Sequence, residues 1–202
     1  MHHNFKNFAP SCERNQTYIL SVLQQYLQGR KTVLEIGSYS GQHALYLTKC
    51  LPSLVWQPTD IKRYIGDLSE NLEPHLSEQL LSPKLLDVSH SGSWSSQNYD
   101  VMFTANTLHI MSWSSVIAFF SLAARVMKLS GMLFIYGPFN YHGEFTAPSN
   151  AEFDVWLKVR DAESGIRDFE AIQAQAMLNG LSVVEDISMP ANNRMLIIKK
   201  HS

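Results

Sequence analysis

Three carboxylates close three successive apolar segments, at positions from which acids can hold the polar groups of a cofactor. Glu35 lies two residues before a glycine turn, Asp60 follows the segment 54–59, and Asp87 lies near the end of the segment 84–88. Each also has an ordinary explanation: Glu35 as an anchor for its loop, Asp60 as a helix cap, Asp87 as a solvated loop acid. At these positions Asp60 suits ribose hydroxyls and Asp87 an adenine amino group. Three acids at consecutive segment ends therefore favour one shared ligand.

The glycine turn in "VLEIGSYSG" distinguishes between two classes of cofactor. A dinucleotide turn, G-x-G-x-x-G, requires glycine at positions 37, 39 and 42, but the chain has Gly37, Tyr39 and Gln42. The spacing G-x-G-x-G with an acid two residues earlier is met by Glu35, Gly37 and Gly41, and only Tyr39 departs from it. That is the spacing of S-adenosylmethionine loops, so the turn favours this cofactor over NAD.

Tyr39 is the exception within the turn, where it follows Ser38. We expect both residues to belong to the cofactor site. The tyrosine ring has three possible positions: away from the cofactor, over it as a lid, or in the place of its methionine end. The first two are favoured, because the third would leave the three acids without a common purpose. A positive φ at this residue would cost about 1–3 kcal/mol.

Two side chains are candidates for the chemistry itself. His109 follows the segment 99–105 and is a candidate general base; the alternative is a packed histidine bonded to a neighbouring loop. Tyr136 ends a later apolar segment, where it either orients a substrate or packs in the core with its hydroxyl at the rim. His43 follows the glycine turn, where a positive helix end favours a neutral, structural imidazole.

The stretch "SNAEFDVWLKVRDAESGIRDFE" carries an apolar helical face and two arginines. Phe153, Trp156 and Leu157 share that face, which we interpret mainly as helix packing. Arg160 and Arg167 either grip an acidic group of a substrate or pair with neighbouring aspartates. The histidines lack metal-ligand spacing such as HExxH, so no required metal is predicted.

Helical and strand periods alternate along the chain and predict a parallel sheet covered on both faces. In such sheets, ligands bind at the carboxyl ends of the strands. The segments expected to form strands are 32–36, 54–59, 84–88, 99–105, 132–136, 181–189 and 195–199, and those expected to form helices are 11–28, 40–50, 61–76, 112–127, 150–159 and 168–179. Ser11, Asn150 and Asp168 are the expected helix caps, and the last two strands form an antiparallel hairpin. Residues 138–168 are expected to be a loop-and-helix insertion that covers the site.

Bulk composition agrees with one domain over residues 1–202. The chain is 45% hydrophobic and 17% charged, with a net charge of −2, which argues against a dedicated nucleic-acid or anionic-membrane surface. Its two cysteines form no disulfide framework, and its start lacks an apolar signal core. No apolar run is long enough to span a membrane. We therefore expect a cytoplasmic protein, and composition leaves its oligomeric state open.

The chain resembles class I S-adenosylmethionine-dependent methyltransferases in "VLEIGSYSG", "PTD" and "LLDV" and in its order of elements. More closely, it resembles an uncharacterised methyltransferase-like family, through segments that include "APSCERN", "WQPTD", "ANTLHIMSW", "YGPF", "APSNAEFDVWLKVRD" and "MPANNRML". The resemblance implies a Rossmann-like three-layer α/β sandwich, with a mostly parallel seven-stranded sheet and a C-terminal antiparallel hairpin.

The resemblance also implies a role for each motif position. Glu35 and the backbones of Gly37 and Gly41 would hold the methionine end of the cofactor, and Asp60 the ribose. The adenine would contact Asp87 and Val88, and the backbone at Asn106 would hold the amino-acid end. Two positions depart from the family pattern: Tyr39 replaces a glycine, and Ser164 replaces an aromatic residue.

These observations support an S-adenosylmethionine-dependent methyltransferase acting on a small-molecule acceptor. The alternative is a degenerate member that binds the cofactor weakly or not at all and serves as an interaction module; Tyr39 is its main support. A nicotinamide-dependent oxidoreductase comes third, because the glycine spacing is wrong. The segment "NTLH" lacks the Asn-Pro-Pro-aromatic sequence of amide- and base-directed methyltransferases, which disfavours nucleic-acid acceptors.

Overall fold

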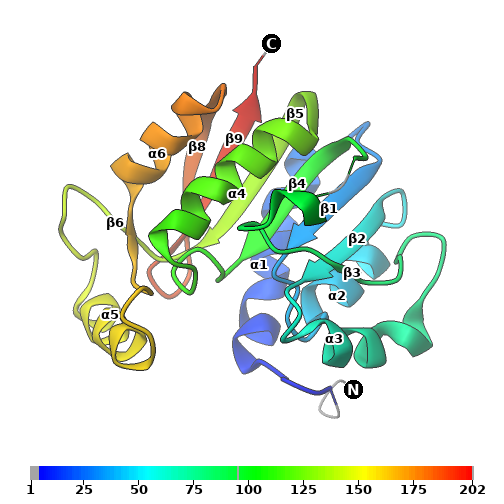
Figure 1. Cartoon of the computed structure of the whole chain (residues 1–202), viewed down its shortest axis with the longest axis horizontal. Coiled ribbons are helices and arrows are strands. Elements are labelled where there is room, and N and C mark those ends of the chain that lie inside the picture. Colours follow the sequence, from blue (N-terminus) through cyan, green and yellow to red (C-terminus); the bar gives the residue numbers. More distant parts are fainter. Residues whose placement is uncertain (1–4, 95, 202) are drawn as a thin grey trace.

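The computed structural model describes residues 5–94 and 96–201 and has a central sheet between layers of helices (Figure 1). Seven strands lie side by side in the order β3-β2-β1-β4-β5-β9-β8. Their bounds are β1 Thr32–Ile36, β2 Val55–Asp60, β3 Lys84–Leu85, β4 Tyr99–Ala105, β5 Met127–Gly137, β8 Leu181–Met189 and β9 Asn193–Lys200. Strands β1 to β5 are parallel, whereas β9 pairs antiparallel with both β5 and β8. The predicted Rossmann-like fold with its terminal antiparallel hairpin is confirmed.

Helices cover both faces of the sheet. The helices are α1 Pro10–Tyr26, α2 Gln42–Cys50, α3 Ile65–Leu72, α4 Trp113–Val126, α5 Pro148–Arg160 and α6 Phe169–Leu178, with short 3-10 turns at Glu73–His75 and Ser91–Ser93. Residues of α1, α2 and α3 share one buried cluster with the sheet, and residues of α4 and α6 share the other. Helix α5 stands apart at the end of the sheet where β4 terminates (Figure 1). None of the described helices is long and apolar enough to cross a membrane.

The strands supply both clusters through the alternation of their side chains. In β1, Val33 joins the cluster on the α1 side and Leu34 the cluster on the α4 side. In β4, Val101 and Met102 divide in the same way. A strand buried on both faces carries apolar residues without alternation, as at 33–34 in β1 and 101–103 in β4. The sheet is therefore a rigid support for the loops at its carboxyl ends.

Two helices begin earlier than predicted, and each has proline in its first turn. Helix α1 begins at Pro10, so Ser11 lies inside the helix and is not its cap. Helix α5 begins at Pro148, so Asn150 is also internal; its amide donates to Thr146 Oγ1 at 2.9 Å and to the Asn192 carbonyl at 3.4 Å. Proline suits a first helical turn, since the N–H that it lacks would have no intrahelical partner there. Asp168 does precede α6, but its side chain makes no capping bond.

Other boundaries differ where loops displace regular structure. The predicted strand 84–88 is regular only over Lys84–Leu85, and the predicted helix 61–76 is regular only from Ile65. The expected loop after β5 contains a two-residue strand, β6 Phe139–Asn140, which pairs with β7 Arg167–Asp168. These short pieces still leave the strand ends, and therefore the candidate site, where the sequence places them.

Candidate cofactor and acceptor site

The glycine turn after β1 is fastened to the end of β2. The amides of Gly37 and Ser38 donate to the Thr59 carbonyl at 3.1 and 3.0 Å, and the Thr59 amide donates to Ser38 Oγ at 3.1 Å. Gly37, Tyr39 and Gly41 all have positive φ, at 72°, 53° and 81°. Three hydrogen bonds therefore join the glycine turn to the end of β2.

Both glycines are required by close neighbours. A Cβ added to Gly37 would lie 2.8 Å from Thr107 Cγ2, and one added to Gly41 would lie 2.8 Å from Leu72 Cγ and Cδ2. A real Cβ essentially never lies this close to another heavy atom, so a larger residue would force either the turn or its neighbour to shift. Helix α2 starts directly after Gly41, and its positive end faces the loop. The result is a backbone cradle at the carboxyl end of β1.

The segment before α1 is tied to the same cradle. The amide of Lys6 donates to Asn71 Oδ1, and Asn71 Nδ2 donates back to the Lys6 carbonyl and to that of Ser40, all at 2.9–3.0 Å. The Ala9 amide donates to Gln42 Oε1 at 2.7 Å, and this oxygen also accepts from Ser40 Oγ. Residues far apart in the chain therefore hold one side of the glycine turn.

Asp60 lies at the centre of the turn and is buried. Its Oδ2 accepts from the Tyr39 amide at 2.6 Å and its Oδ1 from the Ile61 amide at 2.8 Å. Burial raises the pKa of this carboxyl, and the two backbone hydrogen bonds oppose the rise. Each oxygen has a further lone pair for a ligand hydroxyl. Asp60 is not the cap of α3, which begins four residues beyond Ile61.

Glu35 lies beneath the turn and is also buried. Its Oε2 accepts from the indole Nε1 of Trp56 at 2.8 Å. Burial raises the pKa of Glu35 to about 7; hydrogen bonds from Trp56 and Ser38 oppose the rise, and the Asp60 carboxylate adds to it. Near neutral pH, Glu35 is therefore partly protonated and partly charged. A bound cation would favour the charged form.

The Tyr39 ring lies on the α3 side of the turn. It packs edge-on against Tyr64, with ring centroids 5.1 Å apart and an interplanar angle of 78°, and the Arg63 guanidinium lies 5.4 Å from the Tyr64 ring centroid. The Tyr39 side chain remains 38% exposed. Tyr64 follows β2, so the Tyr39 ring lies on the side of Asp60, the acid predicted to hold the ribose. It does not pack beside Glu35 beneath the turn.

This position predicts that the Tyr39→Gly variant binds S-adenosylhomocysteine within about threefold of the wild-type affinity. The substitution removes an unfavourable positive φ and the ring contact with Tyr64. Because the ring packs against Tyr64, its removal does not open the backbone cradle to the ligand. Isothermal titration calorimetry measures the effect, and Tyr39→Phe controls for the hydroxyl. A gain of tenfold or more would mean that the ring blocks the ligand.

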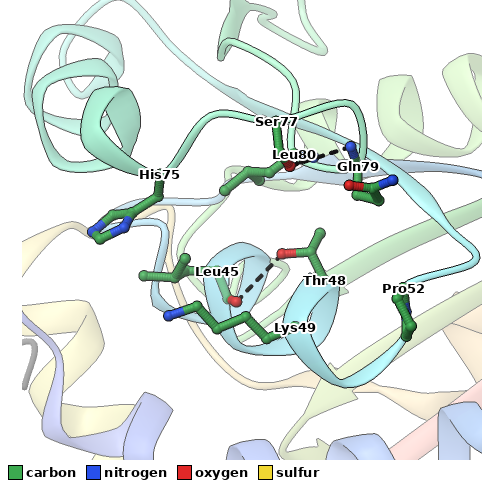
Figure 2. A pocket seen from close by; sticks show the side chains of 8 residues that line it. All are labelled: Leu45, Thr48, Lys49, Pro52, His75, Ser77, Gln79 and Leu80. Atoms are coloured by element: carbon green, nitrogen blue, oxygen red, sulfur yellow. Dashed lines mark hydrogen bonds between the residues drawn. The ribbon is translucent and has the colours of Figure 1, made fainter.

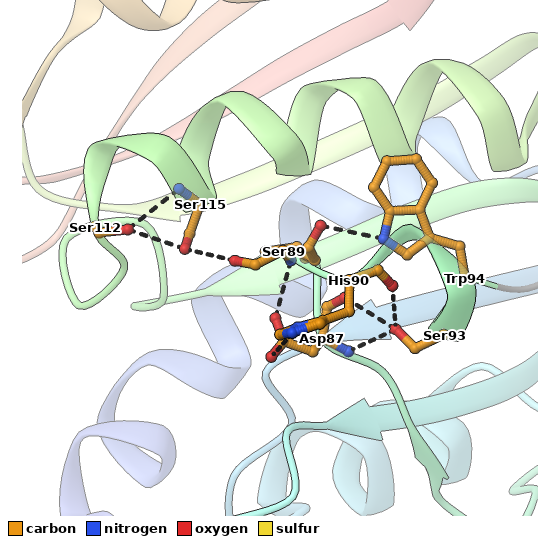
Figure 3. A network of polar contacts seen from close by, with 8 residues as sticks. Asp87, Ser89, His90, Ser93, Trp94, Ser112 and Ser115 are labelled. Atoms are coloured by element: carbon orange, nitrogen blue, oxygen red, sulfur yellow. Dashed lines mark hydrogen bonds and ion pairs between the residues drawn. The ribbon is translucent and has the colours of Figure 1, made fainter.

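The third predicted acid, Asp87, is engaged within its own loop (Figure 3). Its Oδ1 accepts from the Ser89 amide at 2.9 Å, and its Oδ2 lies 3.0 Å from His90 Nδ1. The Val88 carbonyl accepts from Trp94 Nε1, and Ser89 Oγ reaches Ser115 Oγ in the first turn of α4. The network shapes the loop after β3, so any adenine contact there depends on the loop as a whole.

Asn106 and His109 lie together after β4. Asn106 has a φ of 56°, and its amide donates to the Tyr136 carbonyl at 2.8 Å. A Cβ built on Gly137 would lie 3.6 Å from His109 Nδ1 and 3.9 Å from Asn106 Oδ1. The glycine therefore leaves room beside both polar groups, and Thr107, which contacts Gly37, links them to the glycine turn.

His109 is a buried, neutral imidazole. Burial, together with the charge of Arg167, lowers its pKa to about 4. Within residues 5–94 and 96–201, no group hydrogen-bonds to its ring nitrogens, and the ring meets Phe153 edge-on at 5.3 Å. The Gly165 amide donates to its carbonyl at 2.9 Å. A neutral ring with a free nitrogen is able to accept a proton.

Arg167 and Arg160 do not pair with the neighbouring aspartates, which was one of the two roles predicted for them. Arg167 donates to the carbonyls of Leu108, Met111 and Glu163, so it supports the loop that carries His109. The guanidinium of Arg160 lies 4.5 Å from the ring centroid of Trp156. No described carboxylate lies within ion-pair distance of either arginine.

Tyr136 is buried on the α1 face of the sheet, in a polar network of its own. Burial raises the pKa of its hydroxyl, and interactions with Asn15 and Asn193 oppose the rise. Asn15 Oδ1 also lies 2.7 Å from His43 Nε2. Burial lowers the pKa of His43 to about 4, so the ring is neutral, and Nε2 is its donor because the amide oxygen of Asn15 can only accept. Tyr136 therefore joins α1, α2 and β9, and the structure places it with these structural groups.

The model of the DUF938 family, described as "Protein of unknown function", matches residues 6–200. The chain belongs to the DUF938 family.

Solved structures extend the comparison to the fold. An O-methyltransferase family protein from Burkholderia thailandensis superposes with a TM-score of 0.82 at 17% identity, over 95% of this chain and 58% of that one. Human N-acetylserotonin methyltransferase, in complex with S-adenosylmethionine, superposes with a TM-score of 0.80 at 12% identity, over 95% of this chain and 53% of that one. Mitomycin 7-O-methyltransferase superposes with a TM-score of 0.78 at 19% identity, over 93% of this chain and 54% of that one. The chain thus has a methyltransferase fold and spans a little over half the length of these proteins.

Two cavities lie away from the glycine turn. One, of about 240 Å³, lies between α2 and the segment after α3; its lining residues are Leu45, Thr48, Lys49, Pro52, His75, Ser77, Gln79 and Leu80 (Figure 2). Its hydrogen bonds are local, as from Thr48 Oγ1 to the Leu45 carbonyl. The other, of about 250 Å³, lies under the loop after β3 and is lined in part by Gln57 and Tyr99. Neither contains a predicted site residue.

Several residues of the site carry no clear signal in a single sequence. Trp56 reads as an ordinary strand residue, yet it binds Glu35. Tyr64 and Ile61 read as part of a helix, yet Tyr64 packs on Tyr39 and the Ile61 amide donates to Asp60. The partners of Trp56 and Tyr64 lie in other segments of the chain, so a single sequence does not reveal these contacts. The described residues also contain no group of three or more metal-ligating side chains.

Proposed function

We propose that the chain is an S-adenosylmethionine-dependent methyltransferase acting on a small-molecule acceptor. One observation carries the proposal: the buried acids Glu35 and Asp60 converge on a glycine cradle whose neighbour is the neutral His109. In a doubly wound sheet this is the end at which ligands bind.

The groups present fit the chemistry of the cofactor. Its ammonium suits Glu35, its ribose diol suits the spare lone pairs of Asp60, and its carboxylate suits backbone amides at the start of α2. Next to Asp60, Ile61 exposes 39% of its surface and offers an apolar contact for a flat base. Val88 and the loop around Asp87 border the same edge of the sheet.

When bound, the cofactor supplies a methyl group on a sulfonium, which needs alignment more than activation. Alignment of reacting groups lowers a barrier by about 7 kcal/mol or more in ideal cases. The residues of the chain therefore position the acceptor, exclude water and accept a proton. His109 takes the proton of an acceptor hydroxyl as the oxygen gains the methyl group.

The cofactor test is a thermal shift with S-adenosylmethionine, S-adenosylhomocysteine, NAD and NADP. Ligand at 100 times its dissociation constant adds about 2.7 kcal/mol to the unfolding free energy, which is several degrees for this length. We expect a shift with the two sulfur ligands only. If folded protein responds to neither, the methyltransferase proposal fails and the chain is better described as an interaction module.

We expect His109→Gln to lower kcat about 100-fold and to leave S-adenosylhomocysteine affinity unchanged. The size of the loss follows from general-base catalysis, which typically raises the rate by a factor of about 10²–10⁴. Because the pKa of His109 is about 4, the wild-type base is available from about pH 5 upward, so its rate should not fall between pH 6 and 8. Steady-state kinetics with an active acceptor and calorimetry measure the two effects; equal losses in both would argue against a base.

Glu35 should make cofactor affinity depend on pH. An ammonium group binds the charged form, so binding displaces a proton from an acid whose pKa is about 7. Affinity for S-adenosylhomocysteine is therefore expected to rise from pH 5.5 to 7, by up to about tenfold per unit, and to level off above pH 7. Calorimetry in buffers of different ionisation enthalpy detects the released proton. In Glu35→Gln the pH dependence should disappear; if it persists, another group is responsible.

A further inference from the structure

One face of α5 carries a row of side chains that begins beside His109. Phe153, Trp156 and Arg160 are spaced three and four residues apart, so they lie along one side of the helix. The neighbouring side is the packed one, where Asp154 and Leu157 are buried. Packing therefore does not account for the row, although the sequence pattern assigned Phe153 and Trp156 to the same apolar face as Leu157.

The row is continuous. The rings of His109 and Phe153 meet edge-on at 5.3 Å, and the rings of Phe153 and Trp156 are stacked at 5.7 Å with an interplanar angle of 19°. The Arg160 guanidinium then lies 4.5 Å from the Trp156 ring centroid. Aromatic surface thus runs from the candidate base to a cation.

The helix that carries the row is held in place from its packed side. The buried Asp154 accepts from the Ile166 amide at 2.8 Å and pairs with Lys158 at 2.6 Å. Asn150 is bonded to Thr146 and to the carbonyl of Asn192 in the terminal hairpin. A binding wall whose side chains are fixed in advance loses little freedom when a ligand binds.

The outer end of the row is available to a ligand. Trp156 is 49% exposed, which is high for so large an apolar side chain. Among the described residues no carboxylate pairs with Arg160. Its positive charge acts on the Tyr39 hydroxyl, where it opposes the rise in pKa caused by burial. At its inner end the row starts beside His109, in the segment after β4 whose Thr107 approaches Gly37 of the glycine turn.

We propose that this row binds the methyl acceptor, and that the acceptor is an aromatic acid. Its ring stacks along Phe153 and Trp156, its carboxylate or other acidic group pairs with Arg160, and its reacting hydroxyl reaches His109. The inference rests on the proposed methyltransferase function and adds a substrate class to it. Guanidinium and aromatic groups together recognise a flat anion, because each contributes a different contact.

The test uses three probes with the full chain: 4-hydroxybenzoate, which has both ring and acid, phenol, which lacks the acid, and cyclohexanecarboxylate, which lacks the aromatic ring. Tryptophan fluorescence and calorimetry measure binding with and without saturating S-adenosylhomocysteine. We expect 4-hydroxybenzoate to bind at least tenfold more tightly than either of the other probes. Equal affinity for all three, or no binding of any, overturns the proposal.

Two variants assign the contacts. Trp156→Ala should lower affinity for 4-hydroxybenzoate at least tenfold, and Arg160→Gln should remove the preference for 4-hydroxybenzoate over phenol. The matched control is Arg125→Gln, since Arg125 lies 5.7 Å from the Trp94 ring centroid in a similar arrangement elsewhere. If Arg160→Gln behaves like Arg125→Gln, the acid does not bind at the row.

The cofactor measurement separates the two proposals. If S-adenosylhomocysteine binds and the aromatic acid does not, the function stands and the substrate class is wrong. Where the acid binds and neither sulfur ligand does, methyl transfer is overturned and the row remains a binding site. Circular dichroism of each variant shows whether it is folded, and Trp156→Phe provides a milder substitution if Trp156→Ala is not.

Discussion

Replacing Asp60 with alanine is expected to weaken S-adenosylhomocysteine binding about 100-fold, which corresponds to about 2.8 kcal/mol. A hydrogen bond to a charged group contributes about 1.5–3 kcal/mol, and Asp60 would make such bonds to ribose. The carboxylate also accepts from the amides of Tyr39 and Ile61, so its loss frees the turn as well. Isothermal titration calorimetry gives the affinity directly.

Asp87→Asn is the matched comparison for this experiment. It also changes an acid at a strand end, but one whose oxygens are engaged by Ser89 and His90 in its own loop. We expect its effect to be less than tenfold. Should Asp60→Ala bind normally while Asp87→Asn does not, the ribose would lie at β3 and the assignment of the two acids would be reversed.

The second large effect is expected in stability. Gly41→Ala should lower the free energy of unfolding by about 2–5 kcal/mol, because a left-handed conformation costs a non-glycine residue about 1–2 kcal/mol and overpacking costs about 1–3 more. The added Cβ would lie 2.8 Å from Leu72 and 3.0 Å from Leu68 Cδ1. For a chain of this length, the midpoint of thermal unfolding should fall by roughly 5–15 °C.

Gly66→Ala controls for the loss of a glycine as such. Gly66 lies in the first turn of α3, and a Cβ there would meet nothing within 4 Å. Alanine favours helix over glycine by about 1 kcal/mol, so this variant should be neutral or slightly more stable. Thermal denaturation followed by circular dichroism compares the two. Equal midpoints for Gly41→Ala and wild type would mean that α3 moves to accept the methyl group.

The sheet and its order of elements were predictable because local patterns determine them. Strand β4 has the predicted bounds, and β8 and the terminal hairpin follow the sequence closely. The glycine turn was predictable for a related reason, since a chain that leaves a strand and enters a helix so quickly needs positive φ at specific residues. Glu35 and Asp60 therefore lie at the turn as expected.

The rest depends on contacts between distant segments. Nothing local shows that Tyr39 packs on Tyr64, which lies beyond the next strand. The side of α5 that faces His109 is likewise set by Asp154 and its bond to the Ile166 amide, twelve residues along the chain. A helical period identifies an apolar stripe, but it does not say which part of that stripe is covered.

The ties between the segment before α1 and the glycine turn make the two a single cooperative unit. Asn71 bonds to Lys6 and to Ser40, and Gln42 bonds to Ala9 and to Ser40, so neither part can open without breaking bonds of the other. A ligand that stabilises the turn therefore also stabilises the start of the fold against local unfolding. Ligand binding at the turn should therefore also protect the segment before α1 from proteolysis, because both depend on the same local unfolding equilibrium.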